Sequence, residues 1–132
     1  MATIEEALYA KLVATSGVTG LVSTRIYPVV AAQSVAGADY ITYELVSGSP
    51  HHDMAGPEGL AWARVSYLCH SGSYANARAI AAAVLGALDG YRGTASTVDI
   101  WACLSEGVFA VGFDEEARVH TVAADFMVQY EE

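Results

Sequence analysis

Two adjacent histidines followed by an aspartate, His51, His52 and Asp53, come closest in this chain to a metal-binding motif. Imidazole and carboxylate groups are ordinary ligands of divalent metals. Neighbouring residues lack the i, i+4 or C-x-x-C spacing that brings donor atoms onto one ion. The pattern therefore favours polar residues that fill an exposed turn, and we predict no metal site.

Two further groups resemble parts of catalytic sites. Cys69 precedes His70, as in a thiol–base pair, but successive side chains of a strand point to opposite faces of a sheet. Adjacent carboxylates at residues 114–116 suit general acid–base catalysis. However, their segment offers no apolar pocket that would raise the pKa of one of them. The G-x-S-x-G, Walker and G-x-G-x-x-G motifs are absent from the sequence. We predict no enzyme activity and no cofactor.

The composition predicts one folded domain, residues 1–132. Hydrophobic residues make up 54% of the chain, which excludes a disordered protein. The longest apolar run, residues 79–88, is shorter than the ~20 residues that cross a bilayer. Six basic residues, scattered singly, stand against 15 acidic ones, and the net charge is −9. Nucleic acids and anionic membranes attract clustered cations, so we expect neither as a binding partner.

Two helices are predicted. Thr3 and Glu6 form a capping-box pattern, and an apolar stripe follows until Ser16 and Gly17 end the first helix. Ser73 is the expected N-cap of the second helix, which runs to Leu88. The apolar positions of both helices recur at spacings of three and four, which indicates one buried stripe on each. The first stripe contains Ile4, Leu8 and Leu12, and the second contains Ala77, Ile80, Ala81, Val84 and Leu88.

Five strands are predicted, at residues 25–30, 40–46, 60–70, 98–104 and 118–130. Pro28 confines the first to an edge or a bulge, and the others alternate apolar and polar residues. Glycine and proline mark residues 47–59 as a loop, and glycine marks residues 105–117 as another. The order α-β-β-β-α-β-β predicts an α+β fold: a single sheet of about five mainly antiparallel strands, with two helices packed on one face.

Both faces of the strand at residues 60–70 carry large apolar residues. Trp62 and Leu68 lie opposite Val65 and Tyr67, which suits a protein that packs one sheet face on a partner. Cys69 and Cys103 lie in strand-like runs without motif spacing. Free, buried thiols are the default expectation, and a disulfide between them stays open because spacing does not fix its geometry.

Eight short segments, in collinear order over nearly the whole chain, resemble the small tail-completion (tail-terminator) proteins of long-tailed bacteriophages and related particles. They are residues 4–9, 17–19, 25–28, 40–43, 47–50, 63–65, 88–93 and 125–130. Their joint order and the chain length carry the resemblance, since each alone is a short turn, strand or helix-start pattern. The His-His-Asp-Met sequence at residues 51–54 departs from the family pattern.

The resemblance implies a structural virion assembly protein with the fold order given above. Six copies would form a homohexameric ring on the head-proximal end of the tail tube, in a virion or phage-like particle assembled in the host cytoplasm. The ring would stop tube polymerisation and join the tail to the head–tail connector or stopper protein. DNA would only pass through its channel, and no membrane, cofactor or catalysis is implied.

Two sets of residues are assigned roles on this basis. The glycines and prolines of residues 47–59 suit a loop that orders on contact with a neighbouring subunit or the tube. The acidic triplet is the candidate channel-facing set, and it is equally consistent with ordinary surface carboxylates. Two other functions stay open: a small metal-dependent enzyme that uses residues 51–53, and a monomeric ligand-binding module. The candidate contact residues are Ser49, Pro50, His51, His52, Asp53 and Met54, and the candidate channel residues are Asp114, Glu115 and Glu116.

Overall fold

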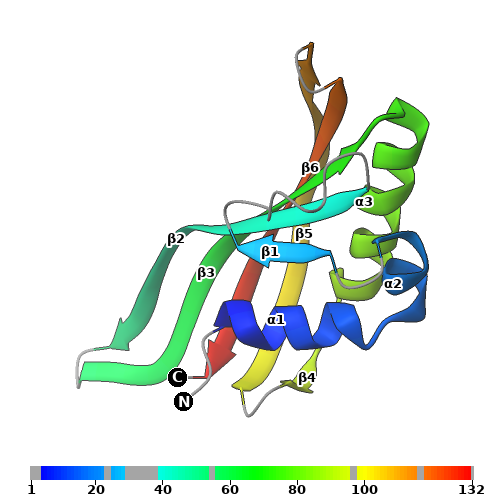
Figure 1. The fold of residues 1–132 in the computed structure, drawn as a ribbon. Helices are drawn as coiled ribbons and strands as arrows, with labels where there is room; N and C mark the ends of the chain where they lie inside the picture. The colour runs from blue at the N-terminus through cyan, green and yellow to red at the C-terminus, as the bar shows by residue number, and fades with distance from the viewer. Residues whose placement is uncertain are drawn as a thin grey trace.

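The computed structural model describes residues 4–22, 25–28, 39–53, 56–95, 98–115 and 118–131. Over these residues it is an α+β fold with three helices and one curled sheet of six strands (Figure 1). The predicted class and the single sheet are confirmed. The predicted numbers of helices and strands were each one too low, and the sheet is mixed.

The helices are α1 (Ile4–Val13), α2 (Ser16–Val22) and α3 (Tyr74–Leu88). Both predicted apolar stripes are buried. Ser73 is the N-cap of α3, but its hydroxyl makes no capping hydrogen bond. The proposed capping box cannot be followed, because Thr3 lies outside the described residues.

Helix α2 was predicted as the end of the first helix and a connector. It has seven residues, two of them glycine, and such a segment has weak helical propensity by itself. Val18 and Val22 are fully buried. We attribute this helix to its packing against α1 and α3, which a local pattern does not reveal.

The sheet has the order β1-β2-β3-β6-β5-β4. Its strands are β1 (Ile26–Pro28), β2 (Tyr40–Asp53), β3 (Gly56–Ser71), β4 (Gly93–Ala95), β5 (Val98–Asp114) and β6 (Val119–Glu131). The β1–β2 pair is parallel and the other pairs are antiparallel. Pro28 ends the edge strand β1, as its missing N–H requires.

Both predicted loops are wrong over most of their length. Residues 47–53 and 56–59 extend β2 and β3, and residues 105–114 extend β5. In β5, the glycines lie at irregularities of strand pairing and not in loops. The register between β5 and β6 shifts at Ser105/Gly107 and at Ala110/Gly112, and both glycines have positive φ. Bulges of this kind bend a strand without ending it.

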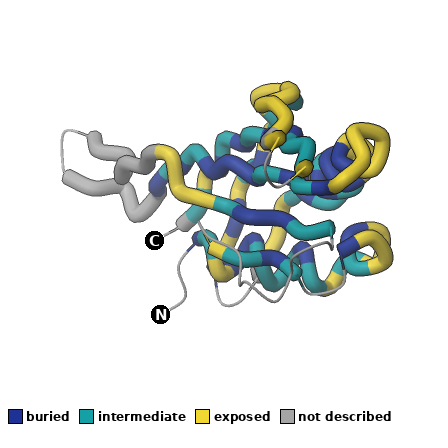
Figure 2. The backbone as a smooth tube through the Cα atoms, turned by 45° about the horizontal axis from the view of Figure 1, so that its top comes forward, coloured by how far each residue is buried: buried dark blue, intermediate teal, exposed yellow. Residues whose placement is uncertain are grey.

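The core lies between the helices and one face of the sheet, and the side chains buried there come from both (Figure 2). Alternate residues of β3 from Ala61 to Cys69 are buried, as are those of β6 from Val122 to Val128. Leu8 of α1, Val84 of α3 and Phe126 of β6 lie in one core, which confirms that these two helices pack on one face of the sheet. No helix in the described part of the chain is long and apolar enough to cross a membrane.

Candidate assembly surfaces

A two-stranded arm carries the predicted contact residues. Residues 49–53 belong to β2, and Met54 lies outside the described residues. The β2–β3 pairing continues to Asp53 and Gly56. The pairing of β3 with β6 begins only at Leu60. The end of the β2–β3 hairpin therefore projects past the rest of the sheet (Figure 1). The backbone positions of these residues suit a contact, and their role as contacts stays a prediction.

No three histidine, cysteine, aspartate or glutamate side chains gather as metal ligands in the part of the chain that the structure describes. Cys69 and His70 alternate on β3 as expected: Cys69 is in the core, and His70 bonds side chains of β2 and β6. The structure therefore separates the residues that resembled a thiol–base pair.

The β5–β6 hairpin carries the acidic triplet at its turn. Asp114 is the last residue of β5, Glu115 is exposed in the turn, and Glu116 lies outside the described residues. Arg118 closes the turn with a φ of 56°, and its guanidinium lies 5.8 Å from the ring centroid of Phe113. His120 on β6 pairs with Phe113, and the centroids of the two rings are 4.5 Å apart.

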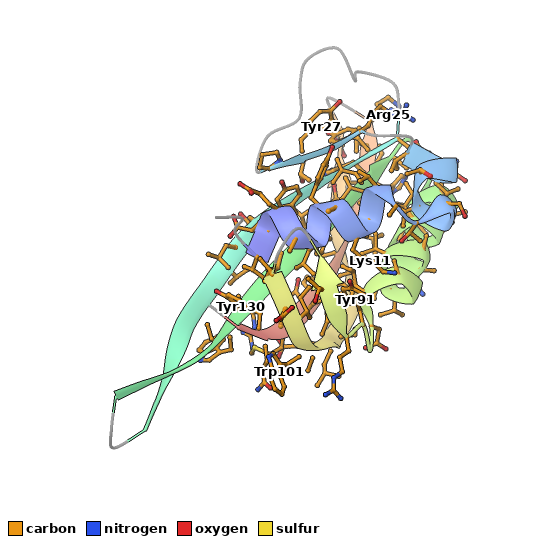
Figure 3. The ribbon with its side chains drawn as sticks, turned by 90° about the horizontal axis from the view of Figure 1, so that it is seen from below. Lys11, Arg25, Tyr27, Tyr91, Trp101 and Tyr130 are labelled. Carbon is orange, nitrogen blue, oxygen red and sulfur yellow. The ribbon has the colours of Figure 1, made fainter. Side chains whose placement is uncertain are left out.

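Strand β5 exposes large apolar side chains along its length. Leu104 and Val111 are each 56% exposed, and Phe109 is 50% exposed. At the start of the strand, Trp101 is half exposed and lies on the far side of the sheet from α1 (Figure 3). Phe109 and Val111 were missed because residues 105–117 were predicted as a loop, whereas Trp101 and Leu104 lie in the strand predicted at residues 98–104. The apolar run from Val108 to Val111 was the signal that could have found Phe109 and Val111.

Side-chain bonds tie the strands together on the face that points away from the helices. Arg64 Nε and Nη2 donate to the two carboxylate oxygens of Glu106 at 2.6 and 2.9 Å. Both side chains are partly exposed, and exposed pairs of this kind contribute ~0.2–1 kcal/mol. Ser66 donates to Asp125 at 2.7 Å. These hydrogen bonds join neighbouring strands and hold this face of the sheet together.

His70 connects three strands on the same face. Its Nε2 lies 2.9 Å from the Thr42 hydroxyl, and its Nδ1 lies 3.0 Å from the Thr121 hydroxyl. The Tyr40 ring stacks on the imidazole at 4.5 Å. Burial lowers the pKa of His70, which favours the neutral ring at physiological pH. Both ring nitrogens are thus engaged, and neither is free to act as a base or a ligand.

Two thiols and one phenol lie in the core. Cys69 and Cys103 are free thiols, so the disulfide left open by the sequence does not form. Burial raises the pKa of each thiol to about 12, with the charge of Asp89 adding to the effect at Cys103. Tyr67 is fully buried, and its hydroxyl has no hydrogen-bond partner in the part of the chain that the structure describes. Thiols and phenols with such raised pKa values are poor nucleophiles at neutral pH.

A shallow hollow beside β4 is lined by Arg92, Thr94, Asp99 and Trp101, among others. The Arg92 guanidinium lies 6.0 Å from the ring centroid of Trp101, and the Thr94 hydroxyl donates to Asp99. The hollow is open to solvent, whereas small-molecule sites are usually concave and enclose most of the ligand. It does not favour the ligand-binding module.

Comparison with known proteins identifies the family of the chain. Residues 6–131 match the family described as "Tail completion protein gp17". A solved chain from the "Virion of native gene transfer agent (GTA) particle" is similar at a TM-score of 0.75 and 25% sequence identity, over 96% of this chain and 92% of that chain. No curated protein matches the chain. The chain therefore belongs to the tail completion protein gp17 family, whose members are structural proteins of phage-type tails.

Proposed function

We propose that six copies of this chain form a ring on the head-proximal end of a phage-type tail tube, stop tube polymerisation and join the tail to the head connector. The family match over residues 6–131 carries the proposal. The similarity to a chain from a gene transfer agent virion supports it. The exposed apolar side chains of β5 support a protein that works by contact with other protein surfaces.

The β2–β3 arm is proposed as one of the contacts with a neighbouring subunit or with the tube. A lone two-stranded hairpin is only marginally stable in water, and β2 and β3 pair beyond the last partner that β6 provides. A partner surface would supply the missing packing. The contact residues in this proposal are Ser49, Pro50, His51, His52, Asp53 and Met54.

The acidic turn of the β5–β6 hairpin is proposed to face the channel. Six chains of net charge −9 give a ring of −54 (6 × −9). Negative potential along a channel repels phosphates and keeps DNA moving, whereas clustered cations would hold it. The β5–β6 hairpin extends beyond the body of the fold in Figure 1, which suits a hairpin end that reaches the channel; the proposed channel-facing residues are Asp114, Glu115 and Glu116.

The decisive experiment is electron microscopy of particles from which this chain has been deleted. Over-long tubes, or tubes not joined to heads, are the expected result, and tails of normal length joined to heads would refute the function. Complementation with the wild-type chain is the control.

A shortened-arm variant tests the contact separately. Pro50 pairs with Ala61, so Asn-Gly in place of residues 51–60 closes the hairpin with a two-residue turn. We expect this variant to fold and yet fail to restore joined tails. Restored tails would show that the arm makes no required contact.

A further inference from the structure

Among the described residues, each end of the sheet is covered along only part of its length. Strand β4 pairs with β5 only from Val98 to Ile100, and no described residue pairs with the outer side of β5 over residues 101–114. Strand β1 pairs with β2 only from Ile41 to Tyr43. An uncovered edge presents unpaired N–H and C=O groups that template another strand. Each end of the sheet is therefore a step.

The paired and unpaired parts of the two sheet ends are complementary in position along the strands. Through β3 and β6, Ile41 of β2 lies level with Ala110 of β5. Likewise, Pro50 lies level with Ile100. Along the strand direction, β1 therefore lies level with the part of β5 that β4 leaves unpaired. Likewise, β4 lies level with the part of β2 that β1 leaves unpaired. When two copies lie side by side, β1 of one copy would therefore fit beside the unpaired part of β5 in the other, and β4 would fit beside the unpaired part of β2.

Strand direction agrees with this arrangement. Strands β1 and β2 run antiparallel to β5 within one chain. A rotation about an axis along the strands keeps these directions, so β1 of a second copy would meet β5 of the first as an antiparallel neighbour. A two-fold axis perpendicular to the strands would instead reverse the strand directions of the second copy. The contact joins two different surfaces, and contacts of that type close into rings when the rotation permits.

Apolar side chains are exposed at both ends of the sheet. Trp101, Phe109 and Phe113 on β5 are 49%, 50% and 42% exposed. Phe109 pairs with Ala123 and Phe113 pairs with His120, so these two rings flank the β5 edge on opposite faces of the sheet. Leu45 and Val46 are 46% and 51% exposed on β2. Each end of the sheet therefore offers exposed apolar side chains beside a strand edge that the described residues leave unpaired.

We infer that copies of this chain associate head to tail, with the β1–β2 end of one copy against the uncovered β5 edge of the next. This inference deepens the proposed ring and rests on it. A symmetric contact of β5 with β5 would leave Leu45 and Val46 of both copies exposed. The head-to-tail contact covers both apolar ends with one repeated interface.

Lysine substitutions at the two ends test the inference, because lysine on an edge blocks pairing. Val111→Lys blocks the β5 end, and Leu45→Lys blocks the β2 end. Leu21→Lys on α2 is the matched control, since Leu21 is 41% exposed and lies on neither end. The purified chains are measured by native mass spectrometry and sedimentation velocity. Wild type and the control should form oligomers, and each end variant alone should be monomeric.

The equimolar mixture of the two end variants decides the geometry. Each has one intact end, so the mixture should give a one-to-one heterodimer and nothing larger. A mixture that stays monomeric, a Val111→Lys chain that still assembles, or a wild-type chain that stays monomeric would overturn the inference. Circular dichroism checks folding, and Val111→Ser with Val46→Ser is the second pair if lysine disturbs the monomer. Failure of the proposed function would instead appear as normal, joined tails in the deletion particles.

Discussion

Replacement of Tyr67 by phenylalanine should stabilise the protein. Tyr67 is fully buried, and its ring packs 5.9 Å from those of Tyr43 and Phe126. Its hydroxyl has no partner among the described residues. A buried hydroxyl without a hydrogen bond costs ~1–3 kcal/mol relative to water. Phenylalanine keeps the ring and its contacts and removes this cost, so the free energy of unfolding should rise by ~1–3 kcal/mol.

Urea and thermal unfolding followed by circular dichroism measure this change. For a domain of this size, 1 kcal/mol corresponds to a Tm shift of roughly 3–6 °C. Tyr74→Phe is the control, because Tyr74 is 47% exposed and surface substitutions stay within about 0.5 kcal/mol. A Tyr67→Phe variant that is equally stable or less stable would show that the hydroxyl has a partner in solution, and the reasoning would be wrong.

The pH dependence provides a second measurement. Burial, with smaller contributions from Cys103 and Tyr43, raises the pKa of Tyr67 well above its ordinary value of 10.0. Above pH 10 the unfolded chain therefore releases a proton that the folded chain keeps, and the stability of the wild type falls as pH rises. Tyr67→Phe lacks this group. The difference in stability between the two chains should widen above pH 10.

The remaining predictions concern the core, the thiols and the acidic turn. Leu8→Ala should lower the free energy of unfolding by ~2–5 kcal/mol, because Leu8 is fully buried; a urea titration showing less than ~1 kcal/mol would contradict the packing. The two buried thiols have a pKa of about 12 in the folded chain against 9.0 in the unfolded one, so each should cost ~1.4 kcal/mol of stability per pH unit between pH 9 and 12. Cys69→Ala should flatten that decline, and an unchanged slope in urea titrations would argue against buried thiols. Lysine at all three positions 114–116 should leave tails intact but slow DNA ejection, with relief at higher salt through screening; unchanged ejection at low ionic strength would leave these residues as ordinary surface carboxylates.

The sequence by itself determined which faces of the helices and strands are buried. Ile80 and Val84 on the stripe of α3 were predicted to be buried, and Val65 and Tyr67 of β3 were predicted to share one face of a strand; all four are buried. Periods of two and 3.6 residues are local properties of a strand and a helix, so the chain displays them directly. The family resemblance was also visible in the sequence, because it rests on the order of short segments.

Only the tertiary structure decided how far the strands extend and which edges stay uncovered. Residues 105–114 continue β5 because β6 pairs with them, and the glycines that suggested a loop occupy bulges. Hydrogen bonds between strands join residues far apart in the chain, so local composition does not report them. The central pairing of β3 with β6 fixes β1–β2 at one end of the sheet and β5–β4 at the other. The two complementary steps exist only because of that long-range pairing.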